Sequence, residues 1–263
     1  MADAQVIPAQ PETVALFISD LHLQTAMPRT AEAFFTFLRN HATKCRQLYL
    51  LGDVFEYWAG DDDISTPFNQ HVVDAIRKLS DLGIQVFWIA GNRDFLVAEE
   101  FEQATGATRL PDPFVTIVAG IKLVLTHGDA HCTDDIEYMA FRAQVRQPGW
   151  QQTFLAMPLA QRKAIIEGLR NDSRLAQQSK TYEIMDVNAG AIESLFESTE
   201  TSFMIHGHTH RPAQHEHFHR QKKNVRFVLP DWDCDTAIPR GGWIAITSDG
   251  AIKRMALNGI EIV

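Results

Sequence analysis

The sequence predicts an α/β fold whose sheet contains parallel strands and is interrupted by a helical insertion. Short aliphatic and aromatic runs, of the kind that form buried strands, alternate with stretches of helical spacing, which is typical of parallel strands joined by helices. Most of these runs end directly in small, polar or ionisable residues. From about residue 134 to residue 198 the alternation stops and the apolar spacing is helical.

The first half of the chain is expected to form four strands and two helices. Apolar residues recur at helical spacing in the second helix, for example at Val72, Ile76 and Leu79. Gly83, directly after it, suits the left-handed residue that ends many helices. The expected strands are Val14–Ile18, Leu48–Leu51, Val86–Ala90 and Lys122–Thr126, and the expected helices are Thr30–Ala42 and Pro67–Leu82.

The middle of the chain is expected to be a helical insertion, or lid. Its helical patterns are Ile136–Val145, Gln151–Met157, Leu159–Leu169, Arg174–Met185 and Val187–Glu197. We therefore divide the chain into a core of residues 1–133 and 199–263 and an insertion of residues 134–198.

The last part of the chain returns to strands. These are expected over Phe203–Ile205, Val225–Leu229 and Trp243–Thr247. Asp249-Gly250 suits a hairpin turn before a final strand at Ala251–Leu257.

Charge and cysteine content exclude several classes of protein. The 263 residues carry 24 basic and 33 acidic side chains, a net charge of −9, so duplex nucleic acid is not expected as a partner. A small anionic substrate stays open, because a metal ion can supply local positive charge. The three cysteines form no CxxC pair, which indicates a reducing compartment. No secretory signal and no membrane-spanning run is visible, so contact with a membrane is expected at its surface only.

Seven oxygen and nitrogen donors follow the predicted strands. Residues one apart, such as Asp20 and His22, point the same way on an extended segment, so each such pair can reach a common centre. Seven donors are too many for one tetrahedral site and suit two adjacent ions, with Asp53 as the bridge. The seven candidate metal ligands are Asp20, His22, Asp53, Asn92, His127, His208 and His210.

Each donor also has an ordinary structural explanation when taken alone. Asp20 could cap a turn, and Asp53 and Asn92 could be turn residues after glycine. His127 could be a core histidine. His206, one residue out of phase with its neighbours, is expected to be structural. The alternating histidines further along, His215, His217 and His219, are expected to face solvent.

The motifs DxH, GD, GN, HGD and GHxH, in this order, resemble those of the calcineurin-like binuclear metallophosphoesterases. The resemblance implies a β-sandwich core flanked by helices. It implies that Asp20, His22, Asp53 and His210 hold one metal ion. The second ion would be held by Asp53, Asn92, His127 and His208.

The residue after Asn92 indicates which kind of leaving group the substrate has. Many relatives have histidine there to assist an alkoxide or phenoxide leaving group, whereas this chain has Arg93. Arginine is a poor proton donor but binds phosphate oxygens with two N–H groups. Arg93 therefore suits a phosphate that leaves from a diphosphate without a proton. The alternative is that Arg93 only pairs with Asp94.

Longer motifs resemble the UDP-2,3-diacylglucosamine hydrolases of lipid A biosynthesis. They are GNRDF from Gly91, HGD with CTDD from His127, IMDVN from Ile184 and IHGHTHRP from Ile205. The resemblance implies attack of metal-activated water on the α-phosphorus of UDP-2,3-diacylglucosamine, giving UMP and 2,3-diacylglucosamine 1-phosphate. It implies two Mn²⁺ per subunit. Asp53, Asn92 and Arg93 would be catalytic, and the substrate-binding residues would be Asn92, Arg93, Asp135, Ser173, Gln177, Lys180 and His208. Gln177 stands where the family usually has Asn.

The insertion then has an expected role and location. Residues of Trp150–Leu169 would line an apolar cleft for the acyl chains and cap the site; an ordinary helical core is the alternative. The enzyme would lie in the cytoplasm, in peripheral contact with the inner membrane of a Gram-negative bacterium. No nucleic acid and no protein partner is implied. The alternative functions are a metallophosphodiesterase for another nucleotide or phosphoester, and a non-catalytic scaffold on the same fold.

Overall fold

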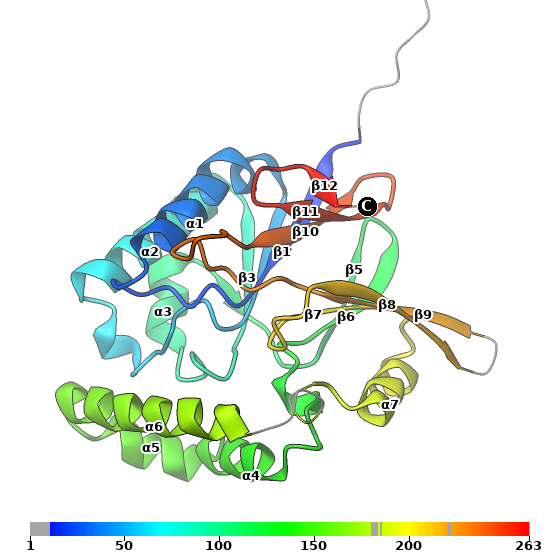
Figure 1. The fold of residues 1–263 in the computed structure, drawn as a ribbon. Coiled ribbons are helices and arrows are strands. Elements are labelled where there is room, and N and C mark those ends of the chain that lie inside the picture. Colours follow the sequence, from blue (N-terminus) through cyan, green and yellow to red (C-terminus); the bar gives the residue numbers. More distant parts are fainter. Residues whose placement is uncertain (1–10, 180–183, 185, 220–221, 263) are drawn as a thin grey trace, which may run out of the picture.

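The fold is built on two sheets that pack face to face (Figure 1). The computed structural model describes residues 11–179, 184, 186–219 and 222–262. The seven-stranded sheet has the order β12 (Glu261–Ile262), β11 (Ile252–Ala256), β10 (Gly242–Thr247), β1 (Thr13–Ile18), β2 (Gln47–Leu51), β3 (Gln85–Ile89) and β4 (Thr108–Arg109). The five-stranded sheet has the order β5 (Phe114–Val118), β6 (Ile121–Leu125), β7 (Phe203–His206), β9 (Lys222–Val228) and β8 (Ala213–His219).

The strands that lead to the candidate site are parallel. Within the first sheet β1, β2, β3 and β4 run in one direction, and within the second β6, β7 and β9 do. The carboxyl ends of these strands therefore share an edge within each sheet, as the alternation of strands and helices predicts. The hairpin turn before β11 is also confirmed, since the N–H of Gly250 donates to the carbonyl of Thr247 at 2.9 Å.

Apolar side chains fill the space between the two sheets. The rings of Phe17, Tyr49 and Phe87 stack across β1, β2 and β3, with centroids 4.8 and 4.7 Å apart. They share one buried cluster with residues of the second sheet such as Leu123 and Ile205. The sandwich that the family resemblance implied is therefore confirmed.

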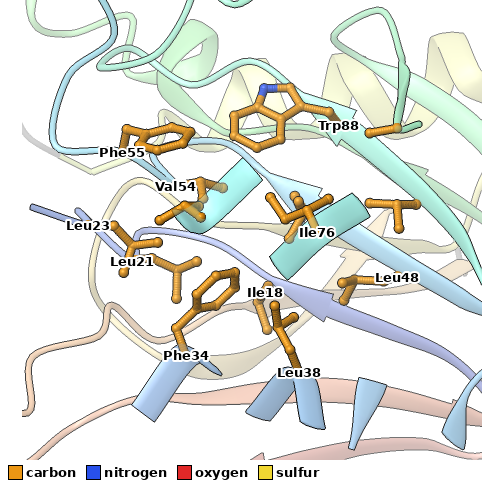
Figure 2. Close-up of a cluster of buried hydrophobic side chains, with 14 of the residues drawn as sticks. Ile18, Leu21, Leu23, Phe34, Leu38, Leu48, Val54, Phe55, Ile76 and Trp88 are labelled. Carbon is orange, nitrogen blue, oxygen red and sulfur yellow. The ribbon is translucent and has the colours of Figure 1, made fainter. Parts of the chain in front are cut away.

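Three helices cover the outer face of the seven-stranded sheet. They are α1 (Pro28–Asn40), α2 (Pro67–Asp81) and α3 (Glu99–Thr105). Figure 2 shows Ile18 and Trp88 of the sheet packed with Phe34 of α1 and Ile76 of α2, and all four are fully buried. Truncation of Phe34 to alanine would cost about 3–5 kcal/mol, because the space that it leaves cannot close.

The remaining helices occupy two separate places. Helix α7 (Ala189–Thr199) covers the outer face of the five-stranded sheet, where Phe196 packs against Met204. Helices α4 (Ile136–Val145), α5 (Pro148–Leu155) and α6 (Leu159–Ser179) lie together beyond one end of the sheets (Figure 1). Phe154 of α5 belongs to the same buried cluster as the core residues Trp58 and Leu96. No helix in the described part of the chain has the length and apolar character needed to cross a membrane.

Some sequence expectations about the elements are wrong. The described part of the helix expected over Arg174–Met185 is not separate: residues 174–179 continue α6 without a break, and residues 180–183 and 185 lie outside the described residues. Helix α3, which has only seven residues, and strand β5, whose side chains are half-buried and exposed in alternation up to Val118, were not predicted from the sequence. His215 and His217 do not face open solvent. They are half-buried on β8, and the ring of His217 lies 6.4 Å from that of Phe196 on α7.

Candidate metal centre and cavity

The seven candidate metal ligands lie at the carboxyl ends of five strands. Asp20 and His22 follow β1, Asp53 follows β2 and Asn92 follows β3. His127 follows β6, and His208 and His210 follow β7. The two sheets thus contribute to one group of side chains, and hydrogen bonds or close contacts connect all seven.

Three of these side chains form the first half of the centre. The ligand atoms of Asp20, His22 and His210 lie within 4.8 Å of one another. His22 Nε2 is 3.3 Å from His210 Nε2, which is 3.4 Å from Asp20 Oδ1. Asp20 Oδ1 is buried, and among the described residues it has no partner with hydrogen-bond geometry. Two imidazole nitrogens and an unpaired carboxylate oxygen that face one another are the donor set of a divalent cation.

The second half of the centre surrounds Asn92. Its Oδ1 lies 3.0 Å from His127 Nε2 and 2.9 Å from His208 Nδ1. Asp53 connects the two halves, since Oδ1 is 3.7 Å from His127 Nε2 and Oδ2 is 4.0 Å from His22 Nε2. The ligand atoms of Asp20, Asp53 and His127 also lie within 4.8 Å of one another. Asp53 therefore lies where a bridging carboxylate is expected.

The backbone at the centre differs from the sequence expectation. Asp20, His22, Asp53, His208 and His210 have φ between 47° and 66°, in the left-handed region, and are not on extended segments. Residues other than glycine rarely adopt this backbone conformation, and those held in it cluster at functional sites. The side chains converge because left-handed turns end the strands. The sequence argument placed the residues of DxH and HxH on extended segments, which is wrong, although the side chains do lie together as expected.

Two glycines make room for the carboxylates. A Cβ at Gly91 would lie 2.2 Å from Asp53 Oδ1, and one at Gly207 would lie 2.2 Å from Asp20 Oδ2. The carboxylates are also held by backbone donors: the N–H of Arg93 donates to Asp53 at 2.8 Å, and the N–H of His208 donates to Asp20 at 2.9 Å. The glycines of the GN and GH motifs are therefore required by close packing against the ligands.

The hydrogen bonds of His127 fit a metal ligand. Its Nδ1–H donates to the carbonyl of Leu51 at 2.8 Å, which directs Nε2 toward Asn92 and Asp53. Metal-binding histidines are typically oriented in this way by a carbonyl or a carboxylate on the other nitrogen. His206, in contrast, is fully buried and faces away, with Nε2 2.9 Å from the Arg226 guanidinium, as expected for a structural residue.

The protonation of the centre follows from its burial and its charges. Burial opposes ionisation of Asp20, but the close approach of His210 and the nearby imidazole charges hold the pKa of Asp20 below the usual range. Burial would lower the pKa of His127, yet carboxylates including Asp53 raise that pKa to about 9. Burial, followed by the charge of His127, lowers the pKa of His208 to about 4. The buried carboxylates thus retain a positive charge in the centre, and a divalent cation would supply it in place of a proton.

Helix α4 of the predicted insertion places polar side chains next to the metal centre, around Asp129. Buried Asp129 accepts hydrogen bonds from Tyr138 Oη at 2.7 Å and from Arg142 Nε at 2.8 Å, both on α4. The Tyr138 ring stacks on His208 with centroids 5.9 Å apart. Asp135 caps α4, since its Oδ1 accepts the N–H of Tyr138 at 3.1 Å. Helix α4 is thereby fixed against the metal centre.

A cavity of about 330 Å³ opens from the centre toward α4, α5 and α6. Asn92 and Arg93 lie at its metal end, together with Asp129 and Tyr138. The rings of Trp150 and Phe154 stack 4.9 Å apart in its wall. The apolar lining is Tyr57, Trp58, Phe95, Leu96, Phe141, Val145, Trp150, Phe154, Ile166 and Leu169. The cavity therefore combines polar residues next to the candidate ligand Asn92 with a largely apolar lining.

Arg93 faces this cavity and does not pair with its neighbour. The Asp94 carboxylate instead accepts the N–H groups of Val54 and Gly91, both at 2.8 Å. Burial and the charge of Asp53 raise the pKa of Asp94 to about 6. Asp94 holds the two ligand loops together, so the alternative that Arg93 serves only as its ion-pair partner is excluded.

The structure does not place the side chains of the other predicted substrate-binding residues at the cavity. Ser173 and Gln177 lie on α6, in the stretch whose side chains are not described, and Lys180 lies outside the described residues. Asp135 is not among the residues that line the cavity. These four stay predictions.

Sequence reasoning missed several residues that contact a candidate ligand or the loops that carry the ligands. Glu56 lies 2.9 Å from His22 Nδ1, and Asp94 joins two ligand loops. Arg146 donates to the carbonyl of Gly91 at 2.9 Å and lies over the Phe95 ring. Their only sequence signal was proximity: Glu56 is three residues after Asp53, and Asp94 two after Asn92.

Comparison with known proteins agrees with this geometry. Residues 14–212 match the calcineurin-like phosphoesterase family. A protein of Aromatoleum aromaticum named UDP-2,3-diacylglucosamine hydrolase is 50% identical over 93% of this chain and 96% of its own length. Proteins of the same name are 46% identical in Bordetella parapertussis (88% and 91% covered) and 43% identical in Escherichia coli O7:K1 (89% and 95% covered).

Proposed function

The chain belongs to the calcineurin-like phosphoesterases and, among them, to the UDP-2,3-diacylglucosamine hydrolase family, and from this premise we propose its reaction and the residues that perform it. It is a metal-dependent hydrolase. Its substrate is UDP-2,3-diacylglucosamine, whose diphosphate is cleaved by water at the α-phosphorus to give UMP and 2,3-diacylglucosamine 1-phosphate. The observation that carries this function is one cavity whose wall contains the candidate ligand Asn92 and its neighbour Arg93 together with a largely apolar lining.

The proposed cofactor is two Mn²⁺ per subunit. The first would be held by Asp20, His22, Asp53 and His210, and the second by Asp53, Asn92, His127 and His208. The unpaired Asp20 Oδ1 and the facing nitrogens of His22 and His210 support this assignment. Bound ions of this kind lower the pKa of water and neutralise phosphoryl oxygens.

Arg93, Asn92 and His208 would bind the diphosphate. The Arg93 guanidinium lines the cavity beside Asn92. It is not paired with the adjacent Asp94, whose carboxylate accepts the N–H groups of Val54 and Gly91. It can neutralise charge on the departing phosphate with two N–H groups, and no proton is needed for departure. Asp53 would be catalytic through its bridging position, which the N–H of Arg93 maintains.

The apolar wall would receive the acyl chains. Trp150 and Phe154 form a stacked surface there, and Ile166 and Leu169 of α6 extend it. Burial of apolar surface contributes about 0.8 kcal/mol per methylene, which is sufficient to distinguish acylated from deacylated sugars. Ser173, Gln177 and Lys180 on and after α6, and Asp135 at the start of α4, complete the proposed substrate residues.

Peripheral contact with the cytoplasmic face of the inner membrane is part of the proposal. The substrate is a lipid, and helices α4 to α6 expose apolar side chains beside the cavity, among them Ile136, Phe141 and Leu169. Such side chains can enter the interface without spanning it. Sedimentation with vesicles of bacterial phospholipid tests this contact, and protein that stays entirely in the supernatant would contradict it.

Product analysis tests the reaction. The protein is incubated with UDP-2,3-diacylglucosamine and Mn²⁺ in water enriched in ¹⁸O, and the masses of the products are measured by mass spectrometry. Label in UMP is expected, because attack occurs at the α-phosphorus. Label in the sugar phosphate would refute that position, and turnover of a simple phosphodiester with none of the lipid substrate would favour the alternative metallophosphodiesterase.

A further inference from the structure

Glu56 contacts a metal ligand and helix α6 with its two carboxylate oxygens. Oε2 lies 2.9 Å from Nδ1 of His22, and Oε1 accepts from the guanidinium of Arg170 on α6. The side chains of Glu56 and Arg170 are 14% and 19% exposed, so water screens this pair only in part. Both lie in the cavity wall.

The contact with Glu56 favours one orientation of the His22 ring. The carboxylate charge 2.9 Å from Nδ1, in a contact without hydrogen-bond geometry, favours a proton on Nδ1 and leaves Nε2 to face His210 Nε2 at 3.3 Å and Asp53 Oδ2 at 4.0 Å. A carboxylate on the remote nitrogen fixes the tautomer and ring orientation of a metal-binding histidine and makes it a stronger ligand. Among the described residues, Glu56 is the carboxylate that contacts Nδ1 of His22.

Arg170 ties this carboxylate to the predicted insertion. Among the described side chains, three ion pairs join α6 to residues 56–63, namely Arg162 with Asp62, Lys163 with Asp63 and Arg170 with Glu56. Of these three, the pair of Arg170 with Glu56 also reaches a candidate metal ligand. The guanidinium of Arg170 lies over the Tyr57 ring, 5.6 Å from its centroid, which restrains it further.

We propose that Glu56 is a positioning residue for the metal ligand His22 and that Arg170 couples this positioning to helix α6. The proposal rests on the metal centre of the proposed function. The placement of α6, which forms part of the substrate cavity, is thereby linked to the order of the first metal site. A substrate that moves α6 or attracts Arg170 would change how firmly His22 is held.

Titration with Mn²⁺, followed by the electron paramagnetic resonance of the free ion, measures this role without turnover. Glu56→Ala is expected to weaken one of the two Mn²⁺ sites by about 10–100-fold, the effect typical of a lost partner of a metal ligand, and to leave the other unchanged. Glu56→Gln, which keeps the shape and one acceptor oxygen, is expected to recover part of the affinity. Two Mn²⁺ sites of wild-type affinity in Glu56→Ala would overturn the proposal.

A double-mutant cycle tests the coupling to α6. Arg170→Met is expected to weaken the same site by a smaller factor, and the double variant with Glu56→Ala should be no weaker than Glu56→Ala alone, because both act through one contact. Multiplicative losses would refute the coupling. Asp62→Asn is the matched control, since it breaks another ion pair to α6 without contact to a metal ligand, and its Mn²⁺ affinities should equal those of wild type. Wild-type protein that binds no Mn²⁺ would refute the proposed function instead.

Discussion

Gly91→Ala should damage the metal centre by displacing one carboxylate. The added Cβ would lie 2.2 Å from Asp53 Oδ1 and 2.4 Å from Asp53 N, whereas ordinary contact begins at 3.4 Å. Asp53 must therefore move by roughly 1 Å. Because the N–H of Arg93 donates to the same carboxylate oxygen, the loops that carry Asp53 and Asn92 must move together. A misplacement of about 1 Å costs catalysis roughly 10²-fold.

Steady-state kinetics and metal analysis of purified Gly91→Ala test this prediction. We expect kcat/KM for UDP-2,3-diacylglucosamine to fall about 10²-fold or more, with a weaker affinity for Mn²⁺. Gly168→Ala is the control, because no described atom outside its own helix backbone lies within 4 Å of the new Cβ and the position is exposed on α6. Wild-type kcat/KM and metal content in Gly91→Ala would refute the bridging role inferred for Asp53.

Four further predictions concern the ligands, the cavity and pH. Asp53→Asn should lose most activity, since an amide is a poor bridge between two cations; near wild-type turnover at limiting metal would contradict it. Arg93→Ala should lower kcat/KM by roughly 10²–10³ with metal content intact, the scale of one lost transition-state donor, and Arg93→Lys should recover only part; an Arg93→Ala variant as fast as wild type would remove the support for a diphosphate leaving group. Trp150→Ala should raise KM for the acylated substrate much more than for a deacylated analogue, and equal effects would indicate a purely structural residue. The raised pKa of His127, about 9, means that the metal must displace a proton below this pH, so Mn²⁺ affinity should rise by up to about tenfold per pH unit toward pH 9, as isothermal titration calorimetry can measure. An affinity independent of pH between 6 and 8 would argue against metal binding by that imidazole.

The sequence alone determined the strands that lead to the candidate metal centre and the donors that follow them. Buried runs such as Phe17 and Ile18 in β1, followed by Asp20, are local patterns, because strand length and the residues at a strand end are properties of neighbouring positions. The order of the motifs was enough to group all seven candidate ligands. It was also enough to single out Arg93 as a residue that differs between families.

The tertiary structure decided how those donors are held. The left-handed backbone at Asp20 and His22 depends on contacts with the turn after β2, where the N–H groups of both residues donate to the carbonyls of Gly52 and Asp53 at 3.0 Å. The approach of Glu56 to His22 and Arg170 joins segments 34 and 114 residues apart, which no local pattern encodes. Hydrophobic periodicity reports that a side chain is buried but not against what, because the partner is chosen by the packing of whole elements.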